Sequence, residues 1–188
     1  MMLHAFLAIL VTIPFASSGG TEHWSVGNIF IDDPTIGFRL DIYSPTTPGS
    51  YPLLIFLSGL SGFIPATFYA TLLTTVAEQN VITIGVSKIE SIKPEKMAVH
   101  LDNFLKWVMK PDDGAARLFA EHQAVQGVTP NMTLLGFLAH SSAGHAVTQY
   151  LNGTCGPIKI LIMMNPVDGI DAKGKIDDFI TRKKTKNS

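Results

Sequence analysis

The chain alternates short apolar runs of strand length with helical patterns, and this alternation limits the possible folds more than any other feature. Residues 53–57 (LLIFL) form a continuous apolar run that ends at Ser58-Gly59, as buried parallel strands do. A helical pattern follows over 66–79, and the β-branched run 81–86 (VITIGV) predicts the next strand. Strands that alternate with helices form βαβ units. The sequence therefore predicts an α/β protein with a mostly parallel central sheet and helices on both faces.

The same alternation extends along most of the chain. We expect further strands over 38–43, 133–139 and 159–164, and further helices over 97–108 and 143–151. After Asp168 the sequence becomes poor in apolar residues and ends in a basic stretch. Residues 170–188 are predicted to form a polar and basic tail, either solvated or in contact with an acidic surface.

Composition excludes several classes of protein. The length of 188 residues suits about one domain, and 46% hydrophobic residues are enough for a core. Lys and Arg number 14 against 15 Asp and Glu, a near-balance that argues against nucleic-acid binding. The single cysteine, Cys155, excludes an internal disulfide scaffold and a cysteine-based zinc site.

The N-terminal segment has the features of a signal peptide. Its apolar run, 3–15, is shorter than the roughly 20 residues that a membrane-spanning helix needs. Small residues follow, and they predict cleavage after Ser18, so that 1–18 is a signal peptide. Asn131 and Asn152 each begin an N-x-Thr glycosylation sequon. The sequence thus favours a secreted or luminal glycoprotein; the alternatives are an uncleaved anchor or an N-terminal core element.

Residues 134–145 (LLGFLAHSSAGH) carry the main chemical signal. A buried strand leads through His-Ser into small residues that begin a helix, which is the layout of a nucleophile elbow. In this turn the residues two before and two after the nucleophile must be small. Ser141 has Ala139 and Ala143 at these positions, whereas Ser142 would have the bulky His140 on one side. We predict Ser141 as the nucleophile; the alternative is a serine-rich turn without chemistry.

The loop after the first central strand fits the same interpretation. Residues 57–62 (LSGLSG) lie between a strand and a helix, where α/β-hydrolases place a backbone donor to the oxyanion hole. The two donors would be the backbone N–H groups of Leu60 and Ser142. The loop could instead bind a phosphate, but it contains no G-x-G-x-x-G motif and no P-loop lysine.

With these motifs the sequence resembles the chlorophyllase family of α/β-hydrolases. The likeness lies in residues 53–62, 78–86, 134–145 and 165–169, within a region from about 38 to 169. The resemblance implies hydrolysis of an apolar small-molecule ester by a Ser-Asp-His triad, without metal or cofactor. Ser141 matches the nucleophile. Asn165 stands at the position of the acid, for which Asp168 is a possible substitute.

The triad histidine has no counterpart in this sequence. In this fold the histidine follows the acid, but all six histidines lie at or before position 145. We therefore expect 19–169 to be an incomplete hydrolase domain that lacks its last strands and its base, so that this chain is inactive or impaired. A non-catalytic secreted lipid- or ester-binding protein on the same scaffold is the alternative function. A partial translation product without a stable fold is a third possibility.

Overall fold

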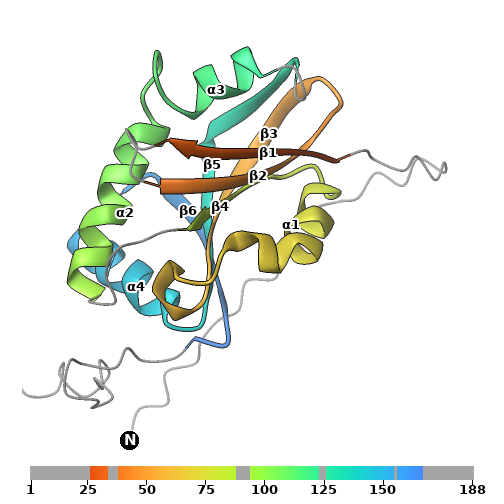
Figure 1. Ribbon diagram of the computed structural model, residues 1–188. Helices are drawn as coiled ribbons and strands as arrows, with labels where there is room; N and C mark the ends of the chain where they lie inside the picture. The colour runs from red at the N-terminus through yellow and green to blue at the C-terminus, as the bar shows by residue number, and fades with distance from the viewer. Residues whose placement is uncertain (1–25, 34–37, 88–93, 123–125, 155, 167–188) are drawn as a thin grey trace, which may run out of the picture.

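A computed structural model describes residues 26–33, 38–87, 94–122, 126–154 and 156–166. The expected cleavage site, Cys155, Asp168 and the expected tail lie outside these ranges. The elements in chain order are β1 (Val26–Asp33), β2 (Phe38–Pro45), β3 (Gly49–Leu57), η1 (Leu60–Gly62), η2 (Ala66–Tyr69), α1 (Ala70–Ala77), β4 (Ile82–Ser87), α2 (Pro94–Val108), α3 (Ala115–Glu121), β5 (Val128–His140), α4 (Ala143–Gly153) and β6 (Ile158–Met164) (Figure 1).

The strands form a mixed sheet in the order β1-β2-β4-β3-β5-β6. Neighbouring strands from β4 to β6 are parallel, whereas β1 and β2 form an antiparallel hairpin and β2 is antiparallel to β4. The parallel strands are connected through helices, as the alternating sequence pattern predicts. The predicted α/β class with a mostly parallel sheet is thus confirmed. The sequence did not indicate β1 or α3.

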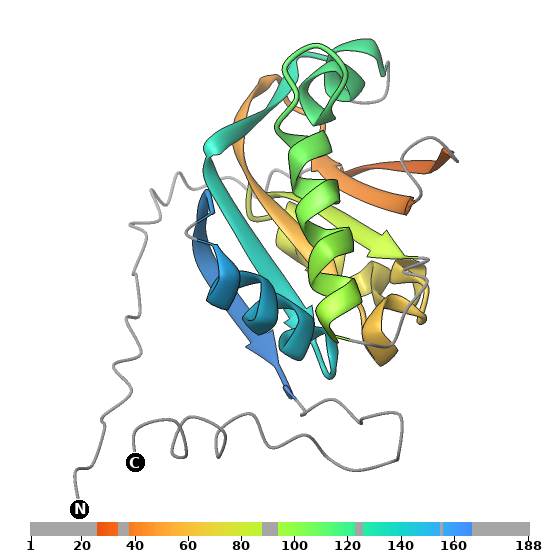
Figure 2. The ribbon, with the colours of Figure 1, turned by 90° about the vertical axis from the view of Figure 1, so that its left-hand side faces the viewer.

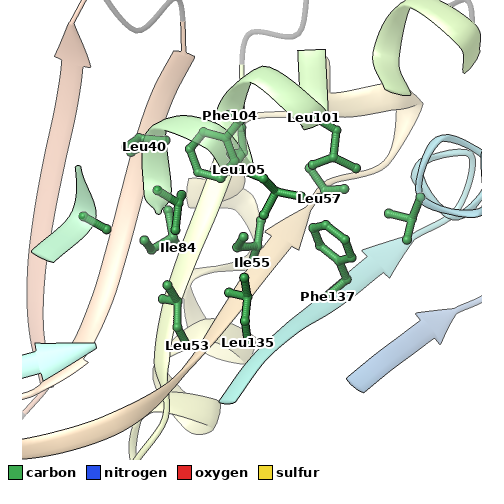
Figure 3. Packing of buried hydrophobic residues seen from close by; sticks show 14 of the residues in the cluster. Leu40, Leu53, Ile55, Leu57, Ile84, Leu101, Phe104, Leu105, Leu135 and Phe137 are labelled. Carbon is green, nitrogen blue, oxygen red and sulfur yellow. The ribbon is translucent and has the colours of Figure 1, made fainter. Parts of the chain in front are cut away.

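The two faces of the sheet are covered by different helices. Helices α2, α3 and α4 lie on one face (Figure 2). Their residues Phe104 and Phe119 belong to one buried cluster with strand residues such as Ile55, and Figure 3 shows Phe104 in this cluster. Helix α1 and η2 cover the other face (Figure 1). There Leu73 and Phe56 belong to a second buried cluster. Central strands are buried on both sides, which explains why their sequences are continuous apolar runs rather than alternating ones.

Several predicted elements have other bounds in the structure: β3, for example, begins at Gly49 rather than at residue 53. The expected helix over 66–79 consists of η2 followed by α1, which ends at Ala77, and Asn80 beyond it has a φ of 62°. Strand β5 begins before the expected 133, and its pairing with β3 is interrupted after Asn131. The Asn131 side chain accepts hydrogen bonds from the amide and the hydroxyl of Thr133 at 3.0 and 2.7 Å. This local bonding competes with the sheet ladder and accounts for the interruption.

Strand β2 carries a carboxylate that is buried in the core of the protein. Asp41 is 1% exposed, and within the described ranges its Oδ2 atom has no hydrogen-bond partner. Burial raises the pKa of Asp41, and the positive charge of Arg39 partly opposes this rise. The segment that covers this face, 66–77, contains no charged residue.

No helix in the described ranges is long and apolar enough to cross a membrane.

Candidate functional site

The expected site residues come from turns at one edge of the sheet. Leu57 at the end of β3 pairs with Ala139 of β5, and His140 at the end of β5 pairs with Met164 of β6. Because the three strands are parallel and end almost level, the loops that follow them meet at their carboxyl edge. Open α/β sheets bind ligands at this edge.

The turn after β5 holds Ser141 in a left-handed backbone conformation. Its φ is 57°, a region that non-glycine residues rarely adopt. The turn is fixed by two backbone bonds: Ser141 N–H donates to the Met164 carbonyl at 3.0 Å, and the Ser141 carbonyl accepts from Gly144 N–H at 3.1 Å. Ser142 has an ordinary helical φ of −65°. The sharp strand-to-helix corner therefore lies at Ser141, at the residue that the small-neighbour argument selected.

The close approach of strand and helix is also found. Ala139 and Ala143 are both completely buried. One residue further on, a Cβ added to Gly144 would lie 3.3 Å from the Cβ of Pro166, which is tighter than most real contacts. The need for small residues thus extends to Gly144, where it comes from the turn after β6 rather than from the strand.

The loop after β3 is closed by its own hydrogen bonds. The buried Ser58 hydroxyl donates to the Ile64 carbonyl, and Gly62 N–H donates to the Ser58 carbonyl at 3.2 Å. Within this loop Leu60 has a φ of 47° and is 64% exposed. Leu60 opens η1, so its N–H is one of the donors that the turn itself leaves unused. The η1 turn lies against α4, the helix that follows Ser141.

A side-chain bridge connects these two turns. The Tyr69 hydroxyl lies 2.9 Å from His140 Nδ1 and accepts a hydrogen bond from Gly59 N–H at 3.3 Å. Tyr69 was not singled out from the sequence. No local motif marks it, because its partner lies 71 residues away in the chain.

Asn165 lies in the third turn. It directly follows Met164, whose carbonyl binds the Ser141 amide, and it has a φ of 43° and an exposed side chain. The structure thus places Asn165 next to the Ser141 turn. Asp168, the possible substitute for the acid, lies outside the described residues.

The four described histidines have different surroundings. His100 lies on α2, and His122 is exposed at the end of α3. His145 is buried on α4, one turn after Ser141, whereas His140 contacts Tyr69. Within the described part of the chain, no group of three His, Cys, Asp or Glu side chains could hold a metal ion.

Unusual backbone geometry is concentrated at this edge. Among the described non-glycine residues, those with a positive φ are Leu60, Asn80, Ser141 and Asn165. Leu60, Ser141 and Asn165 follow β3, β5 and β6, whereas Asn80 follows α1. Residues in such conformations cost of order 1–3 kcal/mol each and tend to occur at functional sites.

The two sequons lie away from this edge. Asn131 is paired with Pro52, well before the ends of β3 and β5. Asn152 is exposed in the last turn of α4.

Known proteins resemble this chain in sequence and in fold. The family model for chlorophyllase matches residues 21–186. No curated protein matches the sequence significantly. A fungal esterase from Rhizomucor miehei superposes with a TM-score of 0.52 and 17% identity, over 80% of this chain and 46% of the esterase. The Francisella virulence factor BioJ superposes with a TM-score of 0.55 and 14% identity, over 77% of this chain and 45% of BioJ. The chain thus spans about half the length of these two structures.

Proposed function

The chain belongs to the chlorophyllase family, and from this premise we propose that it is part of a secreted carboxylic ester hydrolase with Ser141 as nucleophile. The observation that carries this proposal is the φ of 57° at Ser141, at a turn between a buried strand and a helix. A strained turn of this kind presents a serine hydroxyl at the carboxyl edge of the sheet, at the positive end of the following helix.

In the proposed reaction the Ser141 oxygen attacks the ester carbonyl carbon while its proton passes to a histidine. The tetrahedral intermediate collapses, the bond to the alcohol breaks, and the alcohol leaves with that proton. Water then hydrolyses the acyl-enzyme and restores the serine. The backbone N–H groups of Leu60 and Ser142 would bind the oxyanion, since Leu60 lies in the η1 turn against α4 and Ser142 is the N-cap residue of α4.

The proposed triad needs a base and an acid in addition to Ser141. We assign the base to a histidine supplied from beyond these residues, because the fold places it after the acid. Exposed apolar side chains on the edge strand β6 (Ile160, Leu161 and Ile162) fit a sheet that continues in the whole protein. Asn165 occupies the position of the acid, where an amide can orient a histidine but cannot stabilise its positive charge. In serine proteases the replacement of the triad aspartate by asparagine costs about 10⁴ in turnover.

The substrate class proposed is an apolar ester. Residues 42–77 contain no charged residue and no histidine, and they include the loop that carries Leu60. In this segment Leu60, Phe63 and Phe68 expose more than half of their side-chain surface, Phe68 as much as 80%. An uncharged apolar surface on the segment that carries Leu60 suits an ester with an apolar alcohol or acyl group better than a charged one.

Secretion and glycosylation belong to the same proposal. Asn131 and Asn152 lie away from the catalytic edge, so attached sugars would not obstruct it. The Asn131 side chain accepts a hydrogen bond from the Thr133 hydroxyl at 2.7 Å, within β5.

Labelling with a fluorophosphonate probe tests the nucleophile. The whole protein should react, Ser141→Ala should not, and the matched Ser142→Ala should react like the wild type. Absence of labelling in folded protein would contradict the proposal. Saturable binding of an apolar ester without turnover, unaffected by Ser141→Ala, would instead support the non-catalytic binding function, for which the neutral Asn165 is the favouring observation.

A further inference from the structure

A hydrogen-bonded bridge joins the β3 loop to the β5 turn. Gly59 N–H donates to Tyr69 Oη at 3.3 Å, and Tyr69 Oη lies 2.9 Å from His140 Nδ1. Gly59 directly precedes Leu60, and His140 directly precedes Ser141. The bridge therefore ends next to the proposed oxyanion donor on one side and next to the proposed nucleophile on the other.

We propose that Tyr69 and His140 are positioning residues, which hold the Leu60 amide at a fixed place relative to the Ser141 hydroxyl. The inference rests on the proposed function, which supplies the roles of Leu60 and Ser141. A tyrosine hydroxyl has one proton and two acceptor sites. With the Gly59 amide on one acceptor site, the proposal has the hydroxyl proton donated to His140 Nδ1. This direction places the proton of the neutral imidazole on Nε2.

Aromatic packing keeps the bridge rigid. The Tyr69 ring lies 4.8 Å from that of the fully buried Phe56 and 5.4 Å from the His140 ring, in tilted and edge-on arrangements. Such offset geometry is favourable for aromatic pairs. Tyr69 also sits at the junction of η2 and α1, so its backbone is held by two helical segments. The hydroxyl cannot leave His140 without disturbing these contacts.

The bridge, and not the backbone conformation at this position, requires a glycine at residue 59. Its φ of −62° and ψ of 172° are available to any residue. A Cβ at this position, however, would lie 2.9 Å from His140 Nδ1 and 3.1 Å from Tyr69 Oη. The absence of a side chain thus allows the β3 loop to approach close enough for its amide to reach Tyr69.

Positioning of this kind affects the transition state more than substrate binding. An oxyanion donor acts on charge that develops during the reaction, and removal of one donor costs about 10²–10³ in turnover. A donor that is retained but displaced should cost less, and a loss of about 10- to 100-fold in kcat is expected. KM should remain unchanged, because the ground-state ester does not need the oxyanion contact.

The first test compares two Tyr→Phe variants of the whole protein with a short-chain nitrophenyl ester. Tyr69→Phe should lower kcat by about 10- to 100-fold without changing KM. Tyr51→Phe is the control, because it also removes a hydroxyl that makes one hydrogen bond, to the Thr47 carbonyl at 2.9 Å, but at the start of β3. Wild-type kcat in both variants would overturn the proposal.

A second pair of variants separates the hydrogen bond from simple packing. His140→Asn keeps an acceptor close to the position of Nδ1, whereas His140→Leu keeps bulk but no acceptor. We expect His140→Asn to retain more of the wild-type kcat than His140→Leu. Equal loss in the two variants would overturn the role assigned to the bond.

Nitrogen NMR of histidine-labelled protein in mildly alkaline buffer makes the test independent of activity. An unprotonated Nδ1 and a protonated Nε2 at His140 are expected in the wild type, and a proton on Nδ1 would overturn the proposal even if Tyr69→Phe failed to fold. Turnover that persists in Ser141→Ala would instead refute the proposed function, and the NMR result would still decide the bridge.

Discussion

Replacing Ser141 by glycine should stabilise the protein relative to the same replacement at Ser142. Ser141 has a φ of 57°, and an L-residue in this left-handed region pays about 1–2 kcal/mol that glycine does not. Ser142 has a φ of −65°, where glycine gains nothing. Each glycine also loses about 0.5–1 kcal/mol through the greater freedom of the unfolded chain, and this loss is common to both variants. The free energies of unfolding should therefore differ by about 1–2 kcal/mol in favour of Ser141→Gly.

Urea denaturation of the wild type and the two variants measures this difference. Ser141→Gly should equal or exceed the wild type in free energy of unfolding while it loses all fluorophosphonate labelling. Ser142→Gly should be less stable and should keep labelling. If the two variants were equally stable, or if Ser141→Gly were the weaker one, the backbone at residue 141 would not be strained, and the structural argument for the nucleophile would fail.

Three further predictions concern the core, the triad and the surface. Asp41→Asn should raise the free energy of unfolding by about 1–3 kcal/mol at pH 7, since it removes a buried carboxylate. Burial raises the pKa of Asp41 in the folded state. The buried carboxylate therefore destabilises the folded protein increasingly as pH rises above 3.8, the pKa of this group in the unfolded chain. The gain in thermal melting temperature should thus vanish below that pH. Asp102 on α2 is 39% exposed and pairs with Lys106, so Asp102→Asn should show no gain. Asn165→Asp should increase kcat of the whole protein, by up to about 10⁴, if residue 165 holds the base; an unchanged kcat would place the acid elsewhere. Asn131→Gln and Asn152→Gln should each remove one endoglycosidase-sensitive shift on gels of secreted protein, and a wild type without such a shift would refute glycosylation.

The parts of the fold that the sequence predicted are those in which each segment carries its own signal. The central strands are buried on both faces, so runs such as 53–57 and 81–86 are recognisable without knowledge of their partners. The helix α3 was missed because its buried residues are only Ala115 and Phe119, a single helical repeat. Strand β1 was missed because 29–31 is a short apolar run without alternation, and it becomes a strand by pairing with β2.

The same distinction applies to the candidate site. The Ser141 turn was predictable because its small neighbours are adjacent in sequence. The contact of Gly144 with Pro166 and the bond of Tyr69 to His140 depend on how distant segments pack, and no local pattern encodes them. Residue types alone also gave no sign that Leu60 adopts a positive φ, since leucine does not favour it.

The described non-glycine residues with a positive φ adopt this conformation for different reasons, and these reasons bear on the site. Asn80 follows α1, and it and Asn165 belong to a residue type that tolerates this conformation. This reason does not apply to Leu60 or Ser141, at which glycine would relieve the backbone. At Ser141 the proposed role of the hydroxyl as nucleophile gives a reason for a side chain. At Leu60 the side chain is 64% exposed, so it stabilises the described fold very little. Since Leu60 is both strained and exposed beside the Ser141 turn, we interpret its side chain as a contact for an apolar group bound above that turn.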